Sequence, residues 1–129
     1  KYFLKSPKIA MLGLNPHNSE NKKNSIENKI IKKSINKLKK NRINIKGPYP
    51  ADSIFMKDKI SFDVIIGMYH DQILTPFKTL FKFDALNITL GLKYIRISPD
   101  HGTGQDIIGK NKANPESLIN SVKNILRLT

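Results

Sequence analysis

The sequence predicts an α/β fold, because short apolar runs alternate along the chain with a segment of clear helical periodicity. Two runs have the pattern of buried strands, "KIAMLGL" at residues 8–14 and "FDVIIGM" at residues 62–68. Between them, residues 25–41 repeat apolar side chains at the spacing of an amphipathic helix. The chain has 129 residues, the length of one ordinary domain, and is long enough to bury a core.

The first part of the chain is expected to contain a strand, a helix and a loop. The strand at residues 8–14 stops at residues 15–16, because Pro16 cannot donate to a strand ladder. The helix at residues 25–41 exposes its lysines to solvent on one face, and its other face is apolar: Ile26, Ile30, Ile31, Ile35 and Leu38. Residues 47–55, "GPYPADSIF", are expected to form a turn-rich loop that contains a short helix.

The second part continues the alternation. The strand at residues 62–68 leads into a helix expected from about residue 71 to residue 80. Pro76 must lie early in this helix or kink it. Residues 85–92 and 94–98, "ALNITLGL" and "YIRIS", are rich in the residues that favour strands.

The last helix is the most clearly marked. Asn114 can cap it, and Pro115 fits the first helical position, where the missing N–H is not needed. An apolar stripe follows at helical spacing, made by Leu118, Ile119, Val122, Ile125 and Leu126.

The net charge of +13 would ordinarily indicate a nucleic-acid partner. Only three of the 23 basic residues are arginine, however, and arginine is the residue that reads guanine and grips phosphate in a bidentate way. Lysine, asparagine and isoleucine are abundant together, which is typical of biased codon usage. There is no cysteine, which excludes disulfides and thiolate metal sites, and the apolar runs are too short to span a membrane. We therefore expect a cytoplasmic protein without nucleic-acid or membrane partners.

All three histidines follow candidate strands: His17 in "GLNPH", His70 in "GMYH" and His101 in "SPDH". Neutral imidazole is a common ligand of divalent metals, and open α/β sheets bind ligands at the carboxyl ends of their strands. A histidine can equally be structural, and Asp71 can be a first-turn acid that the helix dipole favours. Spacing alone leaves both interpretations open.

The segment "SPDHGTGQDIIGK" at residues 98–110 is a second candidate site. Gly102 and Gly104 would let a ligand approach the backbone, and Asp106 can accept hydrogen bonds from ribose hydroxyls. The chain contains no complete GxGxxG or P-loop motif, so a glycine-rich turn before a short helix explains the segment equally well.

Five motifs occur together in one order: "GLNPH", "GPYPADSIF", "MYHDQ", "NITLGL" and "RISPDHGTGQDIIGK". Their order and approximate spacing resemble the 4-hydroxythreonine-4-phosphate dehydrogenase family over roughly residues 8–125. The loop after His17 lacks the family's glycines, although Glu20 and Glu27 keep acids in the expected places. The resemblance implies a sheet like that of isocitrate and isopropylmalate dehydrogenases, and it identifies residues 1–129 as the carboxyl-terminal portion of one subunit.

The resemblance also implies a divalent metal bound by three histidines. Two of them match His17 and His70, and the third is expected upstream of Lys1. Zn²⁺ is the implied metal, with Mg²⁺ and Co²⁺ as alternatives. Asp71 can orient an imidazole or take up a proton during catalysis, and both roles stay open.

Substrate and cofactor residues follow from the same resemblance. The substrate-binding residues of the family match Lys78, Asn87 and Arg96. The "DHGTGQDIIGK" segment resembles the cofactor loop of the wider dehydrogenase group, which implies NAD or NADP near His101, Gly102, Thr103 and Asp106.

The implied function is NAD-dependent oxidation and decarboxylation of 4-phosphooxy-L-threonine to 3-amino-2-oxopropyl phosphate in pyridoxine 5′-phosphate biosynthesis. Two alternatives remain: a dehydrogenase of threonate or erythronate 4-phosphate, and a basic nucleic-acid-binding module without catalysis. The resemblance further implies a homodimer with a shared site, and residues 1–129 alone are expected to be inactive.

Overall fold

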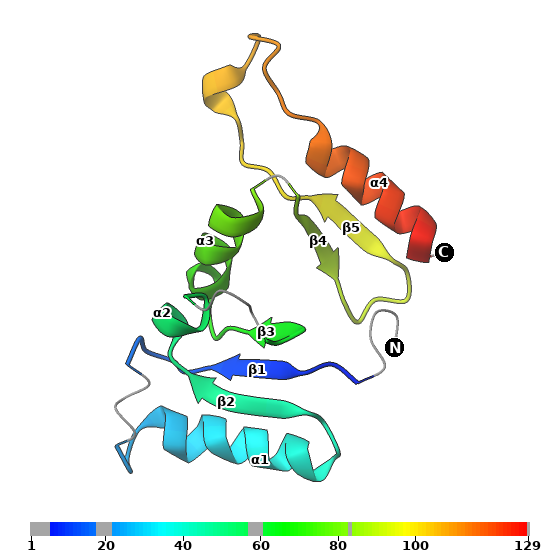
Figure 1. Ribbon diagram of the computed structural model, residues 1–129. Coiled ribbons are helices and arrows are strands. Elements are labelled where there is room, and N and C mark those ends of the chain that lie inside the picture. Colours follow the sequence, from blue (N-terminus) through cyan, green and yellow to red (C-terminus); the bar gives the residue numbers. More distant parts are fainter. Residues whose placement is uncertain (1–5, 18–21, 57–60, 83, 129) are drawn as a thin grey trace. The chain divides into compact units, whose positions relative to one another are not determined.

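The computed structural model describes residues 6–17, 22–56, 61–82 and 84–128. The chain divides into two compact units, Lys1–Pro76 and Phe77–Thr129, hereafter unit 1 and unit 2. Helices and strands alternate in unit 1, and unit 2 combines two consecutive strands with helices, so the mixture of helices and strands that the sequence predicts is present (Figure 1). In the described part of the chain, no helix is long and apolar enough to cross a membrane.

Unit 1 is built on a three-stranded parallel sheet with the order β2-β1-β3. The strands are β1 (Ile9–Leu12), β2 (Ile45–Tyr49) and β3 (Val64–Ile66). Both strands predicted for this region are confirmed with shorter bounds. The central position of β1 explains why its sequence is almost continuously apolar, since both of its faces are covered.

The expectation of a loop over residues 47–55 is wrong in its first part, because Gly47–Tyr49 belong to β2. Glycine and proline are typical of turns, but β2 lies at the edge of the described sheet, where proline is tolerated. The ladder between β1 and β2 also shifts register between Ala10 and Leu12, which accommodates the irregular strand. The short helix expected in this region is present as α2 (Ala51–Ile54).

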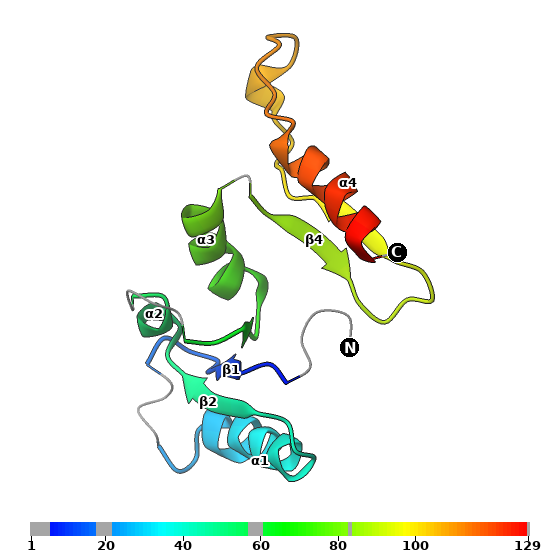
Figure 2. The same cartoon turned by 45° about the vertical axis from the view of Figure 1, so that its right-hand side comes forward.

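The two faces of β1 pack against different helices, because successive side chains of a strand point to opposite sides. On one face, Ile9 and Met11 pack on a cluster made by Ile31, Ile35 and Ile45. On the other face, the buried residues Ala10 and Leu12 form a cluster with Ile54 of α2. Figures 1 and 2 both show the helix that carries Ile35 running along the sheet beside β2.

The helix predicted over residues 25–41 is confirmed as a π-helical turn, η2 (Glu27–Ile31), that continues into α1 (Lys32–Lys40). Its expected apolar face is only partly buried. Ile35 is 2% exposed, whereas Ile26 and Ile30 are 48% and 60% exposed. A π turn holds more residues than an α turn, so it rotates Ile30 within it and Ile26 before it away from the face set by α1.

The helix predicted at about residues 71–80 is α3 (His70–Phe81), and Pro76 lies inside it. Two strands then pair antiparallel as β4 (Leu86–Thr89) and β5 (Arg96–Pro99), in agreement with the β-rich segments of the sequence.

The rest of unit 2 is a single 3₁₀ turn, η3 (Gln105–Ile107), and the helix α4 (Glu116–Leu128). The predicted cap of α4 is confirmed, because Oδ1 of Asn114 accepts a 2.8 Å hydrogen bond from the Glu116 N–H.

The face of α4 that is buried is not its apolar stripe. Ser117 and Ser121 are 1% and 4% exposed, whereas the stripe is largely exposed: Leu118, Ile119, Val122, Ile125 and Leu126. Ser117 explains the orientation, because its hydroxyl donates to the Ala85 carbonyl and accepts from the Asp100 N–H, both at 2.8 Å. One small side chain therefore joins α4 to the two segments that flank the β4–β5 pair.

We expect Ser117→Ala to lower the free energy of unfolding by about 1–3 kcal/mol, because it leaves the buried Ala85 carbonyl and the part-buried Asp100 N–H without this partner. Urea unfolding followed by circular dichroism measures the change. Ser34→Ala, at an exposed position of α1, is the matched control and should shift stability by no more than about 0.5 kcal/mol. Equal stability of the two variants would contradict the expectation.

Candidate functional site

His17 and His70 follow neighbouring strands of the parallel sheet. His17 lies in the turn after β1, and His70 is the first residue of α3, just beyond β3. The carboxyl ends of parallel neighbours lie at the same edge of a sheet, so both histidines belong to one edge of unit 1. Both residues are exposed. This is the edge at which open α/β sheets bind ligands.

Asp71 orients the imidazole of His70. The distance from Nδ1 of His70 to Oδ1 of Asp71 is 2.6 Å. A carboxylate can only accept, so Nδ1 carries the hydrogen and, in the neutral ring, Nε2 keeps its lone pair. A histidine that donates through one ring nitrogen to a carboxylate is the usual arrangement of a metal ligand that binds through the other.

The imidazoles of His17 and His70 are of the type that binds a divalent metal, but two ligands are too few for a complete site. Among the residues that the structure describes, no three His, Asp or Glu side chains gather into a metal site. Zinc sites usually hold three or four protein ligands. His17 and His70 would therefore need ligands from elsewhere, and Glu20 lies outside the described residues.

Glu27 holds the segment that leads to His17. Its Oε1 atom accepts hydrogen bonds from the backbone N–H groups of Leu14 and Asn15, at 3.1 and 3.3 Å, and from Nδ2 of Asn15 at 3.0 Å. Glu27 is 1% exposed. The sequence contained a signal for this, because Glu27 precedes the buried Ile31 and Ile35 at spacings of four and eight and so lies on the buried side of the helix. Sequence reasoning assigned it no role, and it also missed the buried Gln72.

The predicted substrate residues Lys78, Asn87 and Arg96 all lie in unit 2. Asn87 and Arg96 occupy one face of the β4–β5 pair, because residues 87 and 89 alternate onto the same side and Thr89 pairs with Arg96. Nη1 of Arg96 donates to Oγ1 of Thr89 at 2.8 Å, which orients the guanidinium.

Lys78 comes from the last turn of α3, where Nζ lies 2.9 Å from Oδ1 of Asp100. The Lys78 side chain is 45% exposed and that of Asp100 18% exposed, so the lysine side chain is partly accessible while the aspartate side chain is largely covered.

The predicted cofactor residues lie in the loop between β5 and α4. Nδ1 of His101 donates to the Gly102 carbonyl at 3.0 Å, a local contact that shapes the loop. His101, Gly102, Thr103 and Asp106 are exposed. A Cβ atom built at Gly102 would have no neighbour within 4 Å, so packing within the chain does not require glycine there. The short helix expected after the glycines is η3.

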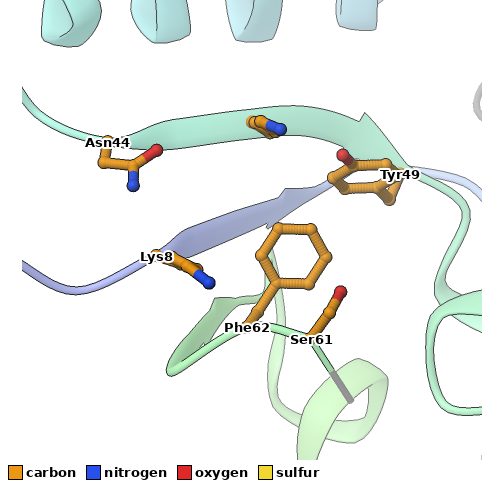
Figure 3. A pocket seen from close by; sticks show the side chains of 6 residues that line it. Lys8, Asn44, Tyr49, Ser61 and Phe62 are labelled. Atoms are coloured by element: carbon orange, nitrogen blue, oxygen red, sulfur yellow. The ribbon is translucent and has the colours of Figure 1, made fainter. Parts of the chain in front are cut away.

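Unit 1 also has a pocket of about 380 Å³, shown in Figure 3. It extends along the sheet, because Lys8, Asn44 and Phe62 each precede one of the three strands, whereas Tyr49 is the last residue of β2. Its lining comprises Lys8, Asn44, Lys46, Tyr49, Ser61 and Phe62, none of which is a predicted site residue. Neither His17 nor His70 lines the pocket.

A protein-family model, described as pyridoxal phosphate biosynthetic protein PdxA, matches residues 1–125. The chain belongs to this family. A curated relative from Sulfurihydrogenibium, named 4-hydroxythreonine-4-phosphate dehydrogenase, is 48% identical over 95% of this chain and 38% of its own length. A relative of the same name from Xanthobacter autotrophicus is 43% identical over 99% of this chain and 37% of its own length.

Solved structures agree with the PdxA assignment. The crystal structure of 4-hydroxythreonine-4-phosphate dehydrogenase from Klebsiella pneumoniae matches 98% of this chain with a TM-score of 0.76 and 36% identity. A structure from Salmonella typhimurium matches 99% with a TM-score of 0.79 and 37% identity. The match covers 38% and 40% of those two chains, so this chain spans about two fifths of the length of its relatives.

Proposed function

We propose that this chain forms part of a metal-dependent, NAD(P)-dependent dehydrogenase that oxidises and decarboxylates 4-phosphooxy-L-threonine to 3-amino-2-oxopropyl phosphate. The observation that carries the proposal is the combination of PdxA membership with two histidines at the carboxyl ends of neighbouring parallel strands. The remaining ligands and the rest of the subunit would complete the site, and a homodimer would share it between subunits.

His17 and His70 would hold the metal through imidazole nitrogens. Asp71 fixes the His70 ring with Nε2 available, so the ring needs no tautomer change before it binds the metal. A bound divalent cation would act as a Lewis acid toward the substrate hydroxyl and the carbonyl that replaces it. Zn²⁺ suits imidazole ligands, and Co²⁺ and Mg²⁺ are the alternatives.

Lys78, Arg96 and Asn87 would bind the anionic substrate. Arg96 can hold a phosphate or carboxylate in a bidentate way, and Thr89 already orients it from the facing strand. Asp100 holds the Lys78 ammonium group by a contact that an incoming anion can replace. Asn87 adds an uncharged donor and acceptor on the same face as Arg96.

The exposed loop with His101, Gly102, Thr103 and Asp106 would bind the nicotinamide cofactor, which accepts the hydride. Asp106 can accept hydrogen bonds from a ribose hydroxyl, and Gly102 leaves the backbone open to close approach. Asp71 lies on the histidine-bearing edge, where a carboxylate can also take up a proton.

The test is an assay of NAD⁺ or NADP⁺ reduction by a chimera in which this chain replaces the matching segment of the Sulfurihydrogenibium relative. We expect turnover with 4-phosphooxy-L-threonine that depends on added divalent metal. Faster turnover with threonate or erythronate 4-phosphate would replace the proposed substrate, and loss of all dehydrogenase activity in a folded chimera would overturn the function.

Within this chimera, Lys78→Ala and Arg96→Ala should each weaken substrate binding by about 2–5 kcal/mol, because each leaves a desolvated anionic group unpaired. The effect should appear mainly in KM. Lys123→Ala removes a lysine from the exposed surface of α4 and serves as the control, with unchanged KM. A KM for Lys78→Ala and Arg96→Ala that matches the control would show that neither cation binds substrate.

A further inference from the structure

Gln72 is buried, although it directly follows two exposed residues of the proposed metal site. It is 6% exposed, although His70 and Asp71 just before it are exposed. A buried carboxamide must satisfy both its oxygen and its nitrogen within the protein. The partners of Gln72 therefore indicate what its burial achieves.

Its two partners belong to the ends of the two strands that lead to the histidines. Oε1 of Gln72 accepts a 2.7 Å hydrogen bond from the Met68 N–H, which lies between β3 and His70. Nε2 of Gln72 donates a 2.7 Å hydrogen bond to the Gly13 carbonyl, which directly follows β1 and leads to His17. One side chain thus joins backbone groups that are 55 positions apart in the sequence (68 − 13).

These two backbone groups are in register with each other. The ladder between β1 and β3 runs from the Ile9–Val64 pair to the Met11–Ile66 pair. Gly13 and Met68 each lie two residues further along. An amide side chain offers the same donor and acceptor as a peptide group. The carboxamide of Gln72 therefore takes the place of a direct backbone hydrogen bond between Gly13 and Met68, and it keeps the two strand ends apart by the width of one amide group.

Neighbouring residues hold this arrangement in place. A Cβ atom at Gly67 would clash with the Ile73 side chain and lie 3.3 Å from Oε1 of Gln72. Because glycine has no side chain, the first turn of α3 can pack closely against the backbone at Gly67. On the other strand, Glu27 binds the N–H groups of Leu14 and Asn15, the two residues after Gly13. The backbone before each histidine is therefore fixed by buried polar groups, while the imidazoles face solvent.

We propose that Gln72 is a positioning residue that sets the separation of the two histidine-bearing strand ends by inserting its carboxamide between them. The proposal rests on the proposed function, in which His17 and His70 bind one metal. Without the carboxamide, the two ends would pair directly or move apart, and the imidazoles would no longer meet one ion at the required geometry.

The experiment compares Gln72→Met and Gln72→Glu in the 129-residue chain, with Co²⁺ as the probe. Methionine has a similar length but offers neither hydrogen bond. Glutamate keeps the acceptor for the Met68 N–H but, as a carboxylate, cannot donate to the Gly13 carbonyl. Gln105→Met makes the same chemical change at an exposed position of η3 and is the matched control.

Three readouts are needed: circular dichroism for folding, amide chemical shifts and hydrogen exchange for the strand ends, and the visible spectrum for Co²⁺ affinity and geometry. We expect Gln72→Met to stay folded and to lose protection from hydrogen exchange at the Met68 amide. The amide signals of Gly13, Leu14 and Asn15 should shift. Co²⁺ should bind at least tenfold more weakly, with an altered visible spectrum. Gln72→Glu should keep the protection at Met68 and still bind Co²⁺ more weakly. Gln105→Met should match the original chain in every readout.

The possible failures are distinguishable. If the original chain binds Co²⁺ and Gln72→Met binds it equally well with the same spectrum, Gln72 does not position the histidines, and the proposed function survives. If the original chain binds no Co²⁺, the same variants are compared in the chimera with the Sulfurihydrogenibium relative, which supplies the ligands that this chain lacks. Absence of Co²⁺ binding by the chimera would show that both the metal site and the role of Gln72 in it are wrong. If Gln72→Met does not fold, Gln72→Glu decides, and undiminished Co²⁺ binding by that variant overturns the proposal.

Discussion

His70→Ala should remove most of the metal affinity of this chain and, in the chimera with the Sulfurihydrogenibium relative, most of its turnover. His70 presents Nε2 for ligation because Asp71 binds its Nδ1–H, and alanine supplies no replacement donor. His17→Ala should have an effect of the same kind, because its imidazole comes from the end of the neighbouring strand. The decrease should appear in kcat, since the metal acts on the reacting group and not only on substrate binding.

The order of the effects tests the assignment further. Asp71→Asn keeps the imidazole but weakens its orientation, so metal affinity should fall by about 10–100-fold, less than on loss of a histidine ligand. His101→Ala should keep its metal and mainly weaken cofactor binding. Metal content by elemental analysis and steady-state kinetics on each variant give the comparison. Full metal occupancy in His17→Ala and His70→Ala, together with metal loss in His101→Ala, would reverse the assignment.

Gly47→Ala should lower the free energy of unfolding by about 2–6 kcal/mol, a large part of the stability of an ordinary domain. Gly47 has φ = +136°, a backbone conformation that residues with a side chain rarely adopt. A Cβ atom there would also clash with the carbonyl oxygen of Met11 and lie 3.2 Å from its carbonyl carbon. Because this neighbour is backbone of the central strand, relief of the clash would disturb the pairing of β1 with β2.

Urea unfolding measures the decrease in the free energy of unfolding. Absence of a cooperative unfolding transition would correspond to the largest decrease expected. Gly102→Ala is the matched control, because its Cβ atom would have no neighbour within 4 Å and its stability should change by no more than about 0.5 kcal/mol. A Gly47→Ala chain as stable as this control would show that the edge strand can adapt to a side chain.

The elements with strong local signals were predictable from the sequence. The apolar run of β1 and the cap at Asn114 depend on neighbouring residues, and the structure contains both where the sequence places them. β2 was not predictable, because Gly47 and Pro48 have the local signature of a turn and become a strand only by pairing with β1.

The candidate site was predictable to a similar extent. His17 and His70 stood out because each follows an apolar run, and the strands before them are neighbours in the sheet. Asp71 and its contact with His70 are also local. The hydrogen-bond partners of Gln72 could not be predicted from the sequence, since its hydrogen bond to Gly13 joins residues 59 positions apart.

The sequence by itself determined the alternation of helices and strands, the family and the residue types that can bind a metal, an anion or a cofactor. Only the tertiary structure decided that the serine face of α4 is buried, that β2 completes the sheet, and that Glu27 and Gln72 hold the two histidine-bearing ends. The physical reason is that local patterns specify which residues share a face of one helix or strand. Which polar group lies opposite that face depends on the packing of distant segments, and the cost of leaving a buried polar group unpaired then selects its partner.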